Sequence, residues 1–175
     1  MCGIIRVHKE PYVRGENLFR LAYETGISGD FPPMRPIPMV LGPDRCVLTR
    51  WGWPDYKPGK IKTHARSETA NHLSTWRDAW ESRRGVVPVA GWDDGGWTVA
   101  SPGAHLAVLW IEAEDGPRLA ILTQDGGPYA DRIERFPCPL TQAGALAWLA
   151  GGDLRGQVTN LRVTGKGGQQ TIFDA

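Results

Sequence analysis

The stretch RRGVVPVAGWDDGGWTVAS, residues 83–101, shows how this chain builds its structure. Two runs rich in β-branched and aromatic residues, 85–92 and 97–101, stand on either side of Asp93-Asp94-Gly95-Gly96. Such runs are typical of strands, and an Asp-Gly pair between them favours a tight turn. The simplest interpretation is a pair of strands joined by a hairpin.

Similar runs recur along the rest of the chain. Glycine, proline or aspartate bounds each of them, and the 22 glycines and 14 prolines supply many such breaks. The proline-rich stretch 31–38 is also expected to be extended, because residues before proline avoid the α region. The further predicted strands cover residues 3–8, 45–50, 105–111, 118–124 and 157–164.

Two segments have the periodicity of helices. Leu73, Trp76 and Trp80 recur at helical spacing, which predicts a helix over residues 73–84. Thr141 is a suitable N-cap for a second helix, which would end at Gly151-Gly152. Few helices among many strands indicate an α+β fold with antiparallel sheets.

Size and composition predict one domain over residues 1–175, with a peripheral tail from about residue 164. Lys and Arg number 20 and Asp and Glu 19, so the net charge of +1 gives no general argument for nucleic-acid binding. The sequence has no apolar leader and no run approaching the roughly 20 apolar residues of a membrane span. We therefore expect a cytoplasmic protein that does not bind membranes.

The three cysteines, Cys2, Cys46 and Cys138, are far apart and stand in no metal-binding spacing. This pattern predicts neither a disulfide framework nor a zinc site, and a reducing compartment fits it best. No metal or cofactor is expected.

Cys2 directly follows the initiator methionine. Removal of Met1 would leave an α-amine and a thiol on one residue, with ordinary pKa values of about 8 and about 8.5. Such a 1,2-aminothiol can condense with an aldehyde and close a thiazolidine ring, or its thiol can attack an amide with the amine as base. The alternative interpretation is that Cys2 merely follows the start codon.

Between Cys2 and about Leu149 the chain carries short motifs in a fixed order. In that order and at similar spacing, they resemble motifs of the SOS response-associated peptidase (SRAP) family, also called abasic-site processing proteins. Each motif is weak by itself, and the agreement of the series carries the resemblance. The motifs are Cys2-Gly3, Trp51-Gly52, Thr63-His-Ala-Arg-Ser-Glu-Thr-Ala70, Trp76-Arg-Asp-Ala-Trp80, Arg83-Arg-Gly-Val-Val-Pro88, Gly91-Trp-Asp-Asp94, Ala107–Trp110 and Ala120–Thr123.

The resemblance implies a fold and a function. The fold would consist of curved antiparallel sheets that form a barrel-like core with flanking helices. The protein would be an SRAP-type cysteine peptidase that removes its own Met1. It would then bind single-stranded DNA with abasic sites and link Cys2 covalently to the ring-opened sugar as a thiazolidine. We expect it to act as a monomer.

Four positions depart from the family pattern. Asp94 stands where the family has Glu, and Ile133 stands where it has His. His64 replaces an Asn, and Ile4 replaces an Arg that contacts DNA phosphate. Catalytic geometry is sensitive to displacements of about 1 Å, so these changes leave open whether the covalent chemistry is retained.

The predicted catalytic residues are Cys2, Asp94 and His64. Asp94 would move protons during sugar opening and imine formation, with Asp93 as a substitute. A neutral His64 near Cys2 would supply the missing general base, since its ordinary pKa is about 6.5. The alternatives are a plain hairpin turn over residues 93–96 and a structural, partly buried His64.

The predicted DNA-binding residues are Arg50, Trp51 and Arg66, through the family match. Trp51 would stack on a base or end a duplex as a wedge, and stacking is worth about 1–3 kcal/mol per base. The alternatives are a core tryptophan, and an ion pair of Arg66 with Glu68 or Asp94. Cations also recur along the preceding segment and predict a basic strand face, or else a solvated edge, at Lys57, Lys60, Lys62, His64 and Arg66.

Two other functions stay open. The absent histidine and the shortened carboxylate would permit a degenerate family member that acts as a non-covalent DNA-binding or regulatory module. Class II glutamine amidotransferases also begin with Met-Cys-Gly-Ile, but their downstream substrate motifs are not found here. The compact size and the divergence would suit a phage or mobile-element protein.

Overall fold

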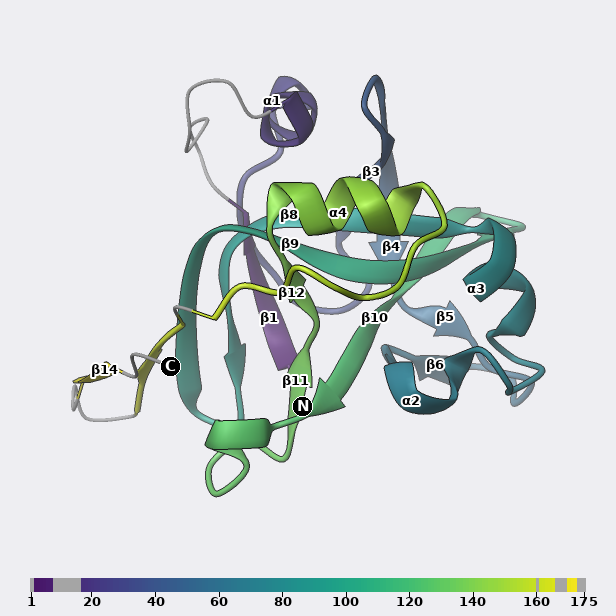
Figure 1. The fold of residues 1–175 in the computed structure, drawn as a ribbon. Helices are drawn as coiled ribbons and strands as arrows, with labels where there is room; N and C mark the ends of the chain where they lie inside the picture. Colours follow the sequence, from purple (N-terminus) through teal and green to yellow (C-terminus); the bar gives the residue numbers. More distant parts are fainter. Residues whose placement is uncertain (1, 8–16, 160, 166–169, 173–175) are drawn as a thin grey trace.

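A closed barrel forms the centre of the computed structural model, which describes residues 2–7, 17–159, 161–165 and 170–172 (Figure 1). Around the ring β9 pairs with β10, β10 with β4, β4 with β3, β3 with β8, and β8 again with β9. The predicted α+β fold, with a barrel-like core and flanking helices, is therefore confirmed. The five strands are β3 (Pro36–Gly42), β4 (Arg45–Trp51), β8 (Arg84–Asp94), β9 (Trp97–Ala113) and β10 (Gly116–Asp125).

One edge of β10 departs from the antiparallel prediction. There β10 runs parallel to β4, with Leu119 opposite Trp51. Further along the same strand it runs parallel to the short strand β7 (His64–Arg66), with Ile121 opposite His64. These pairings between distant parts of the chain place two predicted site residues, Trp51 and His64, beside positions of β10 that are two residues apart.

Residues 84–113 form the β8–β9 hairpin. Its turn consists of Gly95 and Gly96, whose φ angles of 54° and 94° are the positive values that a type I′ turn uses. Asp94 pairs with Trp97, so Asp94 is the last residue of β8 and not part of the turn. β9 is continuous where the sequence predicted two strands, because it stays paired with β8 on both sides of a register shift.

That register shift occurs at Gly91, where the two strands approach too closely for a side chain. A Cβ at Gly91 would collide with the backbone carbonyl of Val99. We predict that Gly91→Ala lowers the Tm by at least about 3 °C, because overpacking typically costs about 1–3 kcal/mol. Thermal unfolding followed by circular dichroism measures the shift. Gly42→Ala is the matched control, since a Cβ there meets its nearest atom at 3.9 Å, and equal shifts in both variants would contradict the prediction.

Additional strands extend the barrel. β1 (Cys2–Val7) pairs with the end of β8 and carries β2 (Gly29–Phe31) on its other edge. The predicted peripheral tail from about residue 164 lies partly outside the described residues. The remaining strands are β5 (Trp53–Pro54), β6 (Ile61–Lys62), β11 (Arg135–Pro137), β12 (Pro139–Leu140), β13 (Arg162–Thr164) and β14 (Gln170–Ile172).

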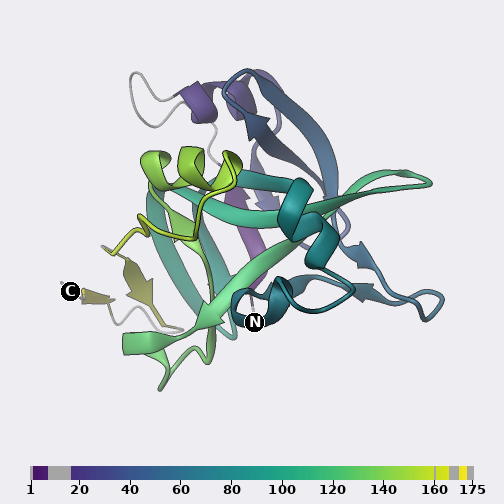
Figure 2. The ribbon, with the colours of Figure 1, turned by 45° about the vertical axis from the view of Figure 1, so that its right-hand side comes forward.

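The helices lie outside the barrel (Figure 2). α4 (Gln142–Leu149) begins as predicted, because the Thr141 hydroxyl accepts a hydrogen bond of 3.1 Å from the Gly144 N–H. α3 (Arg77–Ser82) is shorter than the predicted helix over 73–84. Three further helical elements have no counterpart among the predicted helices: α1 (Asn17–Glu24), the single turn α2 (Ser67–Ala70) and the 3₁₀ turn η1 (Gly127–Tyr129).

Strand alternation divides the core into two layers. Met39, Trp92 and Ile121 belong to the cluster inside the barrel, whereas Leu109 and Trp148 belong to the cluster under the helices. All eight tryptophans are buried or half-buried, as expected for most of them. Among the described helices, none is long and apolar enough to cross a membrane.

Candidate functional site

The pairing of β1 with β8 places Cys2 directly opposite Asp94. The register shifts between Cys2 and Ile4, so Gly3 is an extra residue and Cys2 takes the position beside Asp94. Bulges of this kind occur often next to active sites, and opposed residues in an antiparallel pair have Cα atoms about 4.5–5.5 Å apart. The backbone nitrogen of Cys2, which would become the α-amine after loss of Met1, therefore lies beside the end of β8.

The two neighbouring aspartates have different surroundings. Asp94 is 4% exposed. Asp93 accepts hydrogen bonds from Arg6 Nη2 at 2.6 Å and from Thr98 Oγ1 at 2.8 Å. Asp93 therefore joins three strands together, and the geometry does not favour it as a substitute for Asp94.

His64 is a half-buried neutral imidazole. Its Nδ1 lies 2.8 Å from the Thr63 hydroxyl, and its Nε2 is buried without a hydrogen-bond partner in the described part of the chain. Burial, together with the positive charge of the amino terminus, lowers the pKa of His64 to about 4. This corrects the expectation of a pKa near 6.5. His64 is neutral at physiological pH, with one donor and one acceptor ring nitrogen, and its lowered pKa makes it a weaker base than expected.

Trp51 lies in the core and positions His64. Its side chain is fully buried, its Nε1 donates to the Thr63 carbonyl at 2.8 Å, and its ring meets the His64 ring edge-on with centroids 5.6 Å apart. The prediction that Trp51 stacks on a base or wedges a duplex is therefore wrong in this structure, because stacking needs an exposed ring. The alternative of a core tryptophan holds.

Arg50 and Arg66 are not neighbours. Arg50 Nη1 contacts Asp115 Oδ2 at 2.6 Å, beside the turn that begins β10. Arg66 lies opposite Thr123, near the other end of β10, five residues or about 16 Å along the strand from the partner of Arg50. The two arginines predicted to bind DNA therefore lie at different ends of β10.

Arg66 is exposed and makes no ion pair with any described residue. The expected alternative partner, Glu68, is instead held by Arg135 through two contacts of 2.8 Å. This bidentate pair lowers the pKa of Glu68, with the Arg135 hydrogen bond as the largest cause. Of the two arginines predicted to bind DNA, Arg50 is paired with Asp115, whereas the exposed guanidinium of Arg66 can contact a phosphate.

Ile133, at the family's histidine position, is 2% exposed and belongs to the barrel cluster. The position where the resembled motif has a histidine therefore holds a buried apolar side chain here.

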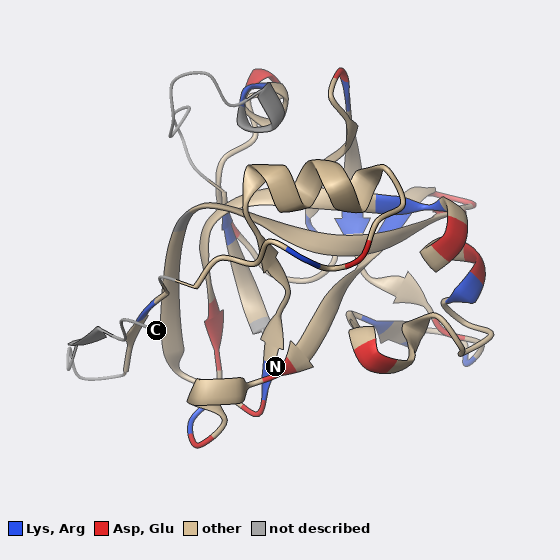
Figure 3. Ribbon diagram, in the orientation of Figure 1, with Lys and Arg blue, Asp and Glu red and all other residues tan. Residues whose placement is uncertain are grey.

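The β5–β6 hairpin carries an aromatic residue that the sequence analysis missed. Tyr56 is 82% exposed, and the ammonium groups of Lys57 and Lys62 lie 5.6 and 5.5 Å from its ring centroid. The predicted basic face is only partly continuous, because Lys62 and His64 are half-buried, whereas Lys60 and Arg66 are exposed. Over the whole fold, basic and acidic residues are interspersed (Figure 3).

Comparison with known proteins supports the fold. No family model and no curated protein matches the chain. The structure is similar to that of a phage-related protein from Bordetella bronchiseptica, with a TM-score of 0.63 and 22% identity, over 89% of this chain and 84% of that one. It is also similar to a protein from Bacteroides thetaiotaomicron, with a TM-score of 0.63 and 17% identity, over 86% and 82% of the two chains.

The neutral state of His64 predicts a pH dependence of stability. A histidine whose pKa is about 4 when folded and about 6.5 when unfolded takes up its proton first in the unfolded chain. The free energy of unfolding should therefore fall as the pH drops from about 6.5 to 4. His64→Gln should reduce this fall by about 2 kcal/mol, measured by urea unfolding at pH 7 and 4.5. A variant with the wild-type pH dependence would contradict the prediction.

Proposed function

We propose that this chain is an SRAP-like protein that binds single-stranded DNA and crosslinks Cys2 to abasic sites. The observation that supports the proposal best is the β1–β8 pairing, which sets the backbone of Cys2 beside buried Asp94.

The proposed chemistry has two stages, which are removal of Met1 and then condensation of Cys2 with the opened sugar. Hydrolysis of the Met1–Cys2 amide first consumes one water and frees the α-amine. That amine then attacks the C1′ aldehyde of the opened sugar and forms an imine with loss of one water. Finally the Cys2 thiolate adds to the imine carbon, and the nitrogen takes up a proton as the thiazolidine closes. Aldehyde and aminothiol thus give thiazolidine and water, with no oxidant or reductant.

Two side chains would move the protons. Asp94 would protonate the departing sugar oxygen and the hydroxyl lost as water when the imine forms. His64 Nε2, which has no other hydrogen-bond partner among the described residues, would accept a proton from the thiol or the amine. With Ile133 in place of a histidine, the site has fewer acid–base groups than the family pattern, and we expect a slow reaction.

Single-stranded DNA would contact exposed side chains on β7 and on the β5–β6 hairpin. Arg66 would hold a phosphate, and the β5–β6 hairpin would offer Tyr56 for stacking between two lysines. The burial of Ile133 also favours a second candidate, a module that binds DNA without the covalent step.

Substitutions of Cys2 and Asp94 test the covalent function. We predict that Cys2→Ala abolishes any denaturant-stable adduct with an abasic oligonucleotide, because the amine alone cannot close a thiazolidine.

Asp94→Asn should slow adduct formation at least about tenfold, the usual loss for a general acid. Denaturing gels over time give the rates. Asp93→Asn is the matched control and should stay within about threefold of wild type; equal slowing of both aspartate variants would remove the special role of Asp94.

Tyr56→Ala tests the predicted DNA surface. Loss of one stacked base should weaken binding of a single-stranded oligonucleotide at least about fivefold. Fluorescence anisotropy with an unreactive tetrahydrofuran analogue of the abasic site measures the affinity without crosslinking. Tyr23→Ala, on the 44% exposed tyrosine of α1, is the control. Similar affinities for the two variants would exclude the hairpin from the DNA surface.

A further inference from the structure

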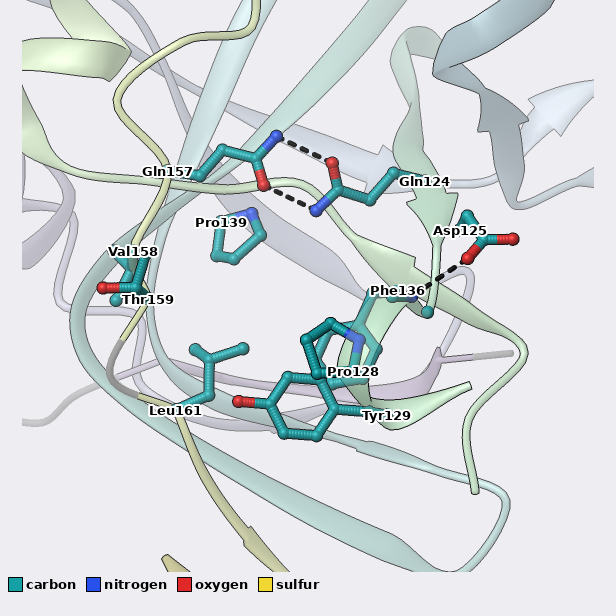
Figure 4. A pocket seen from close by; sticks show the side chains of 12 residues that line it. Gln124, Asp125, Pro128, Tyr129, Phe136, Pro139, Gln157, Val158, Thr159 and Leu161 are labelled. Atoms are coloured by element: carbon teal, nitrogen blue, oxygen red, sulfur yellow. Dashed lines mark hydrogen bonds between the residues drawn. The ribbon is translucent and has the colours of Figure 1, made fainter. Parts of the chain in front are cut away.

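A cavity of about 180 Å³ lies between the β10–β11 connection and residues 157–159 and 161 (Figure 4). It is smaller than the roughly 300–1,000 Å³ typical of pockets for drug-sized ligands, so it suits a group of one ring system. The mechanism proposed for Cys2 uses none of its lining residues.

Flat apolar surfaces form the wall on the barrel side. The rings of Tyr129 and Phe136 stack with centroids 5.1 Å apart and planes inclined by 26°. The rings of Pro128 and Pro139 and the side chain of Leu161 continue this surface. Such a lining favours a planar apolar face over a flexible chain.

Two glutamine amides close the opposite side. Gln124 Nε2 donates to Gln157 Oε1 at 2.5 Å, and Gln157 Nε2 donates to Gln124 Oε1 at 2.7 Å. Each amide keeps a second N–H and a second lone pair, because an amide group has two donors and two acceptor positions. Glutamine amides match the donor and acceptor edges of nucleobases.

The charge of the lining residues restricts the class of ligand further. Among the residues that line the cavity none is cationic, and Asp125 carries a carboxylate. A phosphate or carboxylate would therefore find no counter-charge, whereas an uncharged ring with polar edges would find both apolar planes and amide partners.

The cavity adjoins the candidate site through the barrel end. Phe136 meets the ring of Trp92 edge-on at 5.6 Å, and Trp92 lies two residues before Asp94 in β8. Thr123, the residue before Gln124 in β10, pairs with Arg66 of β7 on the edge of β10 that faces away from β11. β7 and β11 flank β10, so the backbone of Arg66 lies about 10 Å from the cavity wall.

From this arrangement we propose that the cavity binds one unpaired nucleobase of the strand whose phosphates Arg66 contacts. This inference rests on the proposed DNA binding, but not on the covalent step. The base enters between the stacked rings and the glutamine pair, and one of its polar edges exchanges hydrogen bonds with the amides.

The test uses single-stranded oligonucleotides with an unreactive tetrahydrofuran at the lesion position. Each flanking base in turn is replaced by a second tetrahydrofuran, and anisotropy gives the affinity. Loss of the base at one defined position should weaken wild-type binding at least about fivefold. Thr159→Trp, which fills the cavity from its exposed rim, should abolish that dependence, and Thr75→Trp, at an exposed site away from the cavity, should keep it. Equal behaviour of the two variants, or no position dependence in wild type, would overturn the inference.

A second measurement separates failure of the pocket from failure of the proposed function. Deoxyribonucleosides are titrated into labelled protein, and the side-chain amide signals of Gln124 and Gln157 are followed by NMR. Gln124→Leu and Gln157→Leu identify the two pairs of signals. Saturable shifts with nucleosides and none with deoxyribose 5-phosphate would support a base pocket even if no DNA adduct forms. The absence of shifts, or shifts with the sugar phosphate alone, would overturn it even if Cys2 crosslinks normally.

Discussion

The register between β1 and the end of β8 is the constraint on which the candidate site depends. Ile5 lies opposite Trp92, and both side chains are fully buried in the barrel. A slip by one residue would turn the buried face of β1 outward, which makes this register strongly preferred. The same register, with its bulge at Gly3, sets Cys2 opposite Asp94. Apolar packing inside the barrel thus determines where the backbone of Cys2 lies.

The side chains of the proposed site are largely buried. His64 stands against the Trp51 ring, and burial keeps its imidazole uncharged. Asp94 is 4% exposed and the apolar Ile133 is 2% exposed. The proposed site thus combines a buried aspartate, a neutral imidazole and an apolar side chain at position 133. Both functions proposed above, covalent crosslinking and non-covalent DNA binding, agree with these surroundings.

Local sequence rules predicted the features that depend on neighbouring residues. The β8–β9 hairpin, most barrel strands and the Thr141 cap follow from turn residues, alternation and capping. The barrel-like core was predicted from the resemblance of the motifs to those of the SRAP family. Features that depend on distant residues were missed: Asp115, which binds Arg50, lies 65 residues away in the chain. Similarly, periodicity gives no sign that Trp51 is buried or that Tyr56 is exposed, because a tryptophan and a tyrosine suit both environments.

The most direct test of the account is the intact mass of the purified protein before and after incubation with an abasic single-stranded oligonucleotide. We predict loss of the Met1 mass, followed by one DNA adduct with loss of one water, mapped to residue 2 and resistant to denaturant. A chain that keeps Met1, or a mature chain that forms no adduct under these conditions, would contradict the covalent function.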